Sequence, residues 1–378
     1  MENYYETKTV PASGKTGSTN NVPLVSIIIP AFNEAAIMEK SIGIFCKYLS
    51  TLENNYRWEL ILIDDGSTDE TGRLADVIAT CNNKIKVYHH LVNMNLGNAL
   101  KTGFQHSKGD YVITMDLDMS YAPEHIDKML AVLIENQADV VIASPYMKGG
   151  KVTGVPFLRK KLSKFVNKYM SVTSQEKFYT FTSMVRAYNG QFLRSLNLKA
   201  KDYEINPEII YKSMILRARI IEIPAHLDWT FQNSYGQKRT SSIRVFKGIF
   251  SGLMSGFIFR PYIFFLGLGL IIMLISLYII IWIFINTMTI YPDITAANGY
   301  FDDRLSAAIA EVFKARPQAF LIGGGTFIVA LQFLSIGFLS LQNKRYFEET
   351  FHINTTLYKH IQKLEKEVEK ANSSTQLQ

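Results

Sequence analysis

Two aspartates, Asp116 and Asp118, lie two residues apart directly after the short apolar run Tyr111 to Met115. A β-branched apolar run of this length predicts a buried strand, and ligands of parallel α/β sheets bind outside the carboxyl ends of the strands. Two carboxylates at such an end repel each other unless a cation lies between them. Mg²⁺ and Mn²⁺ bind carboxylate oxygens together with substrate phosphates, so the pair is a candidate metal site. The alternative is an aspartate that caps the next helix, and Asp-x-Asp also arises often by chance.

A second pair of carboxylates, Asp64 and Asp65, follows the apolar run Trp58 to Ile63. Carboxylates at the end of a strand suit a ribose hydroxyl or a base edge. The sequence contains neither Gly-x-Gly-x-x-Gly nor Gly-x-x-x-x-Gly-Lys, which argues against a dehydrogenase and a P-loop enzyme. We therefore expect a metal ion, rather than a glycine loop, to neutralise the phosphates of a bound nucleotide.

The elements that position these carboxylates alternate along the chain. Strands are predicted near residues 23–30, 58–63, 85–89, 111–115 and 138–143, and helical stretches run to about Glu53 and through Leu100. Strands that alternate with helices predict a mostly parallel sheet with helices on both faces.

Two long apolar runs occupy the last third of the chain, at about 261–285 and 319–341. Each exceeds the roughly 20 residues that a helix needs to cross a bilayer. Two stretches before them, Phe157 to Met170 and Lys238 to Arg260, combine apolar residues at helical spacing with lysines and arginines. Such helices lie in the membrane interface, although their apolar faces can also pack on the sheet.

The apolar positions of the first of these stretches predict one helical face. They are Leu158, Leu162, Phe165, Val166 and Tyr169.

Charge and cysteine content restrict the partners. The net charge of +7 comes with basic residues beside apolar surfaces, which favours a membrane surface over a nucleic acid as the acidic partner. Cys46 and Cys81 lack disulfide or metal-site spacing, as expected in a reducing compartment. Residues 1–21 are polar and lack the apolar core of a signal peptide, so they are interpreted as a tail.

Basic residues near the apolar runs predict the orientation in the membrane. Arg260 precedes the first run and Lys344 and Arg345 follow the second, whereas the connection 287–316 contains several acidic residues. The positive-inside tendency then puts the α/β domain and both termini in the cytoplasm. In the tail, apolar residues recur from Leu357 to Val368 over two heptads, too few for a coiled coil, and a homo-oligomer is left open.

Four motifs in order resemble family-2 glycosyltransferases with the GT-A nucleotide-sugar-binding fold. They are Pro30-Ala-Phe-Asn-Glu34, Ile63-Asp-Asp-Gly-Ser67, Asn93 to Gly103 and Asp116-Leu-Asp118. Within that family the sequence is similar to polyprenyl-phosphate sugar transferases, over roughly residues 23–260. The expected organisation is a tail at 1–22, a GT-A domain at 23–240, an interface helix with two transmembrane helices at 241–346, and a cytoplasmic helix or tail at 347–378.

The resemblance implies a role for particular residues. Those that would line the nucleotide pocket are Pro30, Phe32, Glu34, Ile63 and Asp65. Those that would meet the sugar diphosphate and its Mg²⁺ or Mn²⁺ are Asp116, Leu117 and Asp118. Arg159 and Ser163 would bind lipid phosphate, and Arg239 or Lys238 would close over the diphosphate.

The sequence departs from the family pattern at several positions. Ser120 stands where the family has a glutamine that assists the metal, and Pro145 replaces an arginine that holds phosphate. Lys148 or Lys151 is a candidate substitute for that arginine, without its forked geometry. The stretch Thr180 to Tyr188 resembles the family's Asp-Pro-Thr-Ser-Gly-Phe-Arg-Ala-Phe motif but lacks its leading aspartate and its glycine.

The resemblance implies inverting transfer of a sugar from a UDP- or GDP-sugar to polyprenyl phosphate at the cytoplasmic membrane face. A phosphate acceptor is already ionised and needs no general base, whereas a hydroxyl acceptor does. The stretch Ala143 to Gly150 resembles the family's acceptor-loop motif, and the only candidate bases after it are Glu204 and Glu208. One alternative is a processive polysaccharide synthase, because Gln342-Asn-Lys-Arg-Tyr346 resembles that class's Gln-x-x-Arg-Trp; another is a non-enzymatic membrane adaptor.

Overall fold

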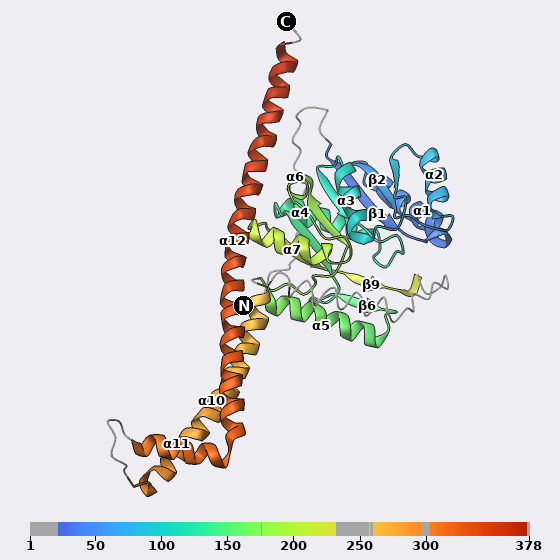
Figure 1. Ribbon diagram of the computed structural model, residues 1–378. Helices are drawn as coiled ribbons and strands as arrows, with labels where there is room; N and C mark the ends of the chain where they lie inside the picture. The colour runs from blue at the N-terminus through green and yellow to red at the C-terminus, as the bar shows by residue number, and fades with distance from the viewer. Residues whose placement is uncertain (1–21, 175, 232–256, 258–259, 296–302, 376–378) are drawn as a thin grey trace, which may run out of the picture.

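The computed structural model describes residues 22–174, 176–231, 257, 260–295 and 303–375 (Figure 1). Its centre is a seven-stranded sheet of order β3-β2-β1-β4-β7-β5-β8. The strands are β1 (Leu24–Ala31), β2 (Arg57–Asp64), β3 (Ile85–His89), β4 (Tyr111–Thr114), β5 (Val140–Ser144), β7 (Arg186–Asn189) and β8 (Ile220–Pro224). All neighbours pair in parallel except β7, which runs antiparallel to β4 and β5. The predicted mostly parallel α/β sheet is therefore confirmed.

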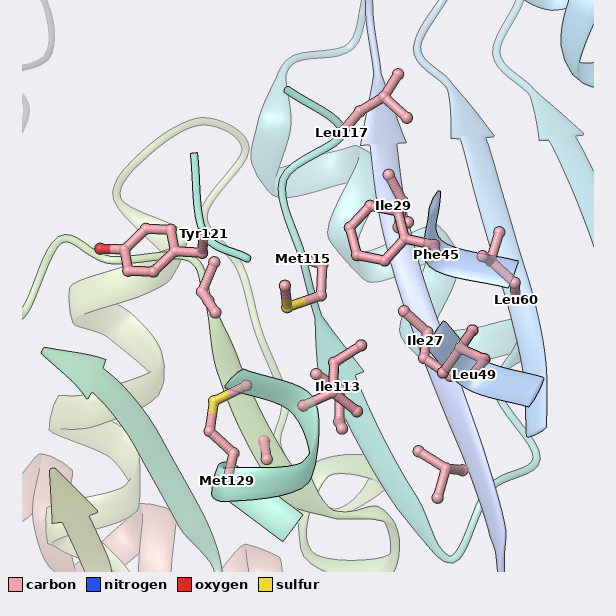
Figure 2. Close-up of a cluster of buried hydrophobic side chains, with 14 of the residues drawn as sticks. Ile27, Ile29, Phe45, Leu49, Leu60, Ile113, Met115, Leu117, Tyr121 and Met129 are labelled. Carbon is pink, nitrogen blue, oxygen red and sulfur yellow. The ribbon is translucent and has the colours of Figure 1, made fainter. Parts of the chain in front are cut away.

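Helices cover both faces of this sheet because its central strands are apolar on both sides. On one face lie α1 (Ala35–Thr51), α2 (Thr71–Cys81) and α4 (Glu124–Glu135). On the other lie α3 (Leu96–His106), α6 (Gly190–Arg194) and α7 (Ile205–Ile215). Figure 2 shows Phe45 and Leu49 of α1 against Ile27 and Ile29 of β1, all four of them buried.

The register of the strands aligns the carboxyl ends that carry the aspartates. Ala31 of β1 pairs with Asp64 of β2, and Ile28 of β1 pairs with Thr114 of β4. The segments after β1, β2 and β4 therefore leave the sheet at the same edge. A two-stranded sheet of β6 (Lys151–Thr153) and β9 (His226–Asp228) lies outside the main sheet and leads into α5 (Phe157–Thr173) (Figure 1).

Helix α5 does not present the single apolar face predicted for it. Val166 and Met170 are buried in the core on the α3 side, whereas Leu158 and Phe165 are 68% and 58% exposed. Val166 and Met170, four residues apart, thus face the domain, whereas Leu158 and Phe165, seven residues apart, face away from it. The second predicted amphipathic stretch, Lys238 to Arg260, lies outside the described residues except for Phe257 and Arg260.

Two helices are long and apolar enough to cross a membrane. They are α10 (Pro261–Ile290) and α12 (Pro317–Thr375), and only 11% of the most apolar window of each is buried. A helix in the core of a soluble domain would be mostly buried, so this finding supports the predicted spans. A short 3₁₀ helix, η1 (Tyr291–Asp293), and α11 (Asp303–Ala315) lie between them.

The two long helices pack closely over part of their length (Figure 1). Gly269 of α10 lies against Leu334 of α12, and the Ser276 hydroxyl donates a 2.9 Å hydrogen bond to the Gly323 carbonyl. Small residues and interhelical hydrogen bonds of this kind hold helices together in lipid. Helix α12 continues past its apolar part and alongside the α/β domain.

Candidate active site

A cavity of about 730 Å³ opens at the sheet edge where β1, β2 and β4 end. The predicted site residues that line it are Pro30, Phe32, Glu34, Asp65, Asp116, Leu117, Asp118, Arg159 and Ser163. The first seven come from the segments after or at the end of the three strands, and the last two come from α5. The structure thus brings the predicted nucleotide, metal and acceptor residues into one space.

Among the described residues, one predicted site residue, Ile63, is not part of this lining. Ile63 lies inside β2, is fully buried and packs in the core beneath α3, so the expectation that it lines the pocket is not met. Its place in the strand ladder explains this, because only the residues beyond Asp64 leave the sheet. Arg239 and Lys238 lie outside the described residues.

Asp65 is held by partners from the segment after β3. Its Oδ1 accepts a hydrogen bond from the Met94 backbone N–H at 2.9 Å and lies 2.7 Å from His90 Nδ1. Since a carboxylate only accepts, Nδ1 of His90 carries the proton, and Nε2 of the same ring lies 2.9 Å from Thr102 Oγ1. Asp64 instead accepts from the Ser67 backbone N–H at 3.1 Å, so it stabilises the turn and does not line the cavity.

The turn after β1 is tied to the turn after β2. The Asn33 side chain accepts from the Thr68 backbone N–H at 2.8 Å, and the Glu34 backbone N–H donates to Thr71 Oγ1 at 2.8 Å. Asn33 adopts a left-handed φ of 55°, which asparagine tolerates better than most residues. These contacts bring buried Glu34 into the same cavity wall as Asp65.

Asp116 and Asp118 form a closely spaced pair joined by Ser120. The Ser120 backbone N–H donates to Asp118 Oδ1 at 3.0 Å, and its hydroxyl donates to Asp116 Oδ2 at 3.3 Å. Met119, which lies between Asp118 and Ser120 and has a φ of 57°, makes the tight turn that allows these contacts. Ser120 therefore holds both carboxylates from the position where the family has glutamine.

Burial and mutual repulsion make this pair electrostatically unfavourable without a cation. Burial and the neighbouring Asp118 raise the pKa of Asp116 to about 8. Burial also raises the pKa of Asp118, and the positive charge of Arg159 opposes that rise. Within the described ranges, no group of three or more His, Cys, Asp or Glu side chains is arranged to hold a metal ion. The protein ligands available here are thus two carboxylates and the Ser120 hydroxyl.

Arg159 and Ser163 lie one turn apart on α5 and both reach the cavity. The Arg159 guanidinium lies 4.3 Å from the centre of the Trp229 ring, and burial lowers its pKa while Tyr203 and Asp118 oppose that change. The Ser163 side chain hydrogen-bonds the Tyr146 hydroxyl, whose pKa is raised by burial. Arg159 is the one Arg or Lys among the described residues that line the cavity.

The proposed substitutes for the missing arginine do not take its place. Pro145 lines the cavity, but Lys148 and Lys151 are exposed and are not among the lining residues. Arg159 is therefore the described cation that can meet an anionic ligand here.

The two candidate bases also do not line the cavity. Glu208 accepts hydrogen bonds from the backbone N–H groups of Lys199 and Ala200 at 2.9 and 2.8 Å, which gives it a structural role, and Glu204 is not among the lining residues. Asp202 and Trp229 do line the cavity. Sequence reasoning missed both because they lie in segments without a recognisable motif.

Comparisons with known proteins find relatives of the α/β domain. Residues 26–196 match glycosyl transferase family 2. The dolichol-phosphate mannosyltransferase of Pyrococcus furiosus is 35% identical over 140 residues, which are 37% of this chain and 38% of that protein. The polyprenol monophosphomannose synthase of Mycolicibacterium smegmatis is 29% identical over 205 residues, 52% of this chain and 75% of that protein.

Solved structures also resemble the chain. The mannosyl-3-phosphoglycerate synthase of Rubrobacter xylanophilus is 14% identical, with a TM-score of 0.46 over 62% of this chain and 72% of that one. The match spans 38% of the length of the dolichol-phosphate mannosyltransferase and 75% of the length of the polyprenol monophosphomannose synthase. The strand order, the paired aspartates and the family match lead to one conclusion: this chain carries a glycosyl transferase family 2 domain with a GT-A-like α/β fold.

Proposed function

We propose that this protein transfers one sugar from a UDP- or GDP-sugar to a polyprenyl phosphate, with inversion at the anomeric carbon. The observation that carries the proposal is that one cavity is lined both by Asp116 and Asp118 and by Arg159 and Ser163 of the lysine-rich helix α5. Curated relatives named for mannosyl transfer to dolichol phosphate and polyprenol phosphate support the same acceptor class.

A divalent cation fits the pair of aspartates. Two buried carboxylates whose pKa values are both raised favour a bound cation, and carboxylate and hydroxyl oxygens are ligands that Mg²⁺ and Mn²⁺ accept. Asp116 and Asp118 would hold the ion with help from Ser120. When bound, the ion neutralises charge on the leaving nucleoside diphosphate.

The nucleoside end of the donor belongs to the wall formed by Phe32, Glu34 and Asp65. His90 and the Met94 backbone N–H both contact Oδ1 of Asp65, and these two contacts fix the orientation of the carboxylate. A carboxylate in this position accepts hydrogen bonds from ribose hydroxyls or from a base edge.

The acceptor end belongs to α5. Arg159 can form charge-assisted hydrogen bonds with a phosphate monoester, and its stacking on Trp229 limits the directions that the guanidinium samples. A phosphate oxygen is already anionic at neutral pH, so the attack on the anomeric carbon needs orientation rather than proton removal.

Membrane association follows from the other side of α5 and from the long helices. The exposed side of α5 combines Phe157 and Leu158 with the exposed lysines Lys161, Lys164 and Lys168. Apolar and cationic side chains on one surface suit an anionic bilayer interface. With α10 and α12 spanning the membrane, the acceptor's phosphate would meet Arg159 at the cytoplasmic surface.

A second candidate acceptor is a sugar hydroxyl, because a hydroxyl acceptor needs a general base and Asp202 places a carboxylate in the cavity wall. The motif that suggested a processive synthase gives this alternative no support. Gln342 and Tyr346 lie on α12, hydrogen-bonded to each other at 3.1 Å, and neither lines the cavity.

Incubation of the purified protein with undecaprenyl phosphate and a panel of UDP- and GDP-sugars tests the proposal. With Mg²⁺ or Mn²⁺ present, we expect one donor to give a lipid product heavier by one sugar residue, detected by mass spectrometry. Absence of a lipid product with every donor, together with sugar transfer to a soluble saccharide, would instead favour the hydroxyl acceptor.

A further inference from the structure

Beyond its apolar part, helix α12 contacts the α/β domain at helix α7. Phe347 and Phe351 of α12 stack with ring centres 5.9 Å apart, and the Lys212 Nζ of α7 lies 5.4 Å from the centre of the Phe351 ring. Phe347 also lines a small cavity together with Tyr211 and Met214 of α7. The helix that leaves the membrane is therefore packed against a helix of the catalytic domain.

Lys212 connects this contact to a loop of the domain. Its ammonium donates to Glu208 Oε1 at 2.6 Å and to the Asn197 carbonyl, and Lys212 and Glu208 are both buried. Glu208 in turn accepts hydrogen bonds from the backbone N–H groups of Lys199 and Ala200. A buried charge pair with these additional hydrogen bonds fixes the backbone of residues 197–200.

The same loop reaches the active-site cavity. Asp202 and Tyr203, which follow it directly, line the cavity, as do Asn206 and Pro207 in the first turn of α7. The Lys201 carbonyl accepts a 3.3 Å hydrogen bond from the Asn98 backbone N–H at the start of α3. Helix α7 thus has one end in the cavity wall and the other on the membrane helix.

We propose that the contact between α12 and α7 holds the cavity wall at residues 197–207 in place relative to the bilayer, with Lys212 as a positioning residue. The inference rests on the proposed function and adds to it how a membrane-bound acceptor is brought to the site. Within the described residues, these hydrogen bonds lead to the predicted nucleotide residue Asp65 indirectly, because Asn98 also donates to the Met94 carbonyl and the Met94 backbone N–H donates to Asp65. Loss of the contact should therefore impair use of the lipid acceptor and leave donor binding nearly unchanged.

Hydrogen–deuterium exchange of the full-length protein in nanodiscs tests the structural part without relying on any activity. In Phe351→Ala, the peptide containing residues 197–203 should exchange about 3- to 30-fold faster, the range expected for loss of a partly desolvated cation–π contact. Peptides of β1 and β4 should be unchanged. Ile353→Ala is the matched control, because Ile353 lies on the same helix and is 65% exposed. Unchanged exchange in Phe351→Ala would overturn the inference.

Steady-state kinetics tests the functional part. Phe351→Ala should raise the KM for polyprenyl phosphate in nanodiscs by about 3- to 30-fold, with the Kd for the nucleotide-sugar unchanged by calorimetry. Lys212→Met should give the same split and Lys212→Arg should restore part of it, whereas a purely structural defect would lower donor affinity as well. Equal loss of donor and acceptor binding would overturn the positioning role. A wild-type protein without lipid transfer, but with the exchange pattern above, would reject the proposed function and not this contact.

Discussion

At the scale of single residues, the paired carboxylates are the feature most dependent on a bound cation. Asp118→Asn removes one charge of the pair without changing its shape, and Ser120 can still donate to the remaining oxygen. We expect kcat to fall by about 100-fold or more, as when one electrostatic contact to a transition state is lost. The thermal midpoint of the metal-free protein should stay the same or rise, because a neutral amide replaces a carboxylate whose charged form is disfavoured by burial.

Asp127→Asn is the matched control for this variant. Asp127 is exposed on α4 and lies outside the cavity lining. Its turnover should equal that of the wild type. A folded Asp118→Asn variant with normal turnover would show that the pair has no catalytic role.

The metal affinity should depend on pH because Asp116 holds a proton in the metal-free protein. With its pKa raised from 3.8 to about 8, Asp116 binds more protons in the folded state than in the unfolded state between these two values, so the free energy of unfolding falls as the pH rises through that range. A cation must displace this proton, so the affinity for Mn²⁺ should rise by up to about tenfold per pH unit and level off above about pH 8. Calorimetric titration with Mn²⁺ across this range measures it, and a flat profile would contradict the assignment.

Arg159 should act on the acceptor. Losing a charge-assisted hydrogen bond to phosphate costs about 1.5–3 kcal/mol, so Arg159→Ala should reduce kcat/KM for lipid phosphate by roughly 10- to 150-fold. Arg159→Lys should recover part of this loss, because an ammonium lacks the forked geometry. Lys128→Ala, which removes an exposed charge on α4 away from the cavity lining, is the control. Loss of nucleotide-sugar affinity with normal lipid dependence would instead assign Arg159 to the donor site.

The sequence predicted the aspartates well because they directly follow strands whose ends share one edge. It could not reveal that Ile63 stays inside the ladder or that Asp202 and Trp229 reach the cavity, since tertiary packing alone decides these positions. His90, which orients Asp65, likewise belongs to no motif and was not anticipated.

At the scale of elements, short or two-faced segments were the hardest to predict. The four-residue strand β7 lies antiparallel between β4 and β5, and no local sequence pattern predicts that pairing. Helix α5 contains apolar residues at spacings that fit two different faces, and only the underlying core assigns Val166 inward and Phe165 outward. The long strands β1 and β2 and the apolar helices α10 and α12 were predictable because their patterns are long and unambiguous.

The packing of α10 on α12 gives a prediction at this scale. A Cβ at Gly269 would lie 3.0 Å from both the backbone N and the Cγ of Leu334, whereas a Cβ at Gly267 would have nothing within 4 Å. Gly269→Val should therefore separate the helices and lower the thermal midpoint in detergent, and Gly267→Val should not. Close approach through small residues is a main source of helix association in lipid. Equal midpoints for the two variants would argue against this interface.

At the scale of the whole molecule, the proposed function has α10 and α12 crossing the membrane, which would place the α/β domain and α11 on opposite sides of it. Ala310 is exposed on α11, and native Cys81 is exposed on α2. In intact cells, a membrane-impermeant maleimide should label Ala310→Cys and leave Cys81 unlabelled until the membrane is permeabilised. Labelling of Cys81 in intact cells would overturn the proposed cytoplasmic location of the catalytic domain.

The central claim is that this protein, bound to the membrane, transfers a single sugar to a lipid phosphate. The most direct measurement offers the wild-type protein, in proteoliposomes containing undecaprenyl phosphate, its active nucleotide-sugar together with a soluble oligosaccharide acceptor. Mass spectrometry of both fractions should find lipid phosphate carrying one sugar residue, no extended saccharide, and no product with Asp118→Asn. Sugar on the oligosaccharide and none on the lipid would contradict the account.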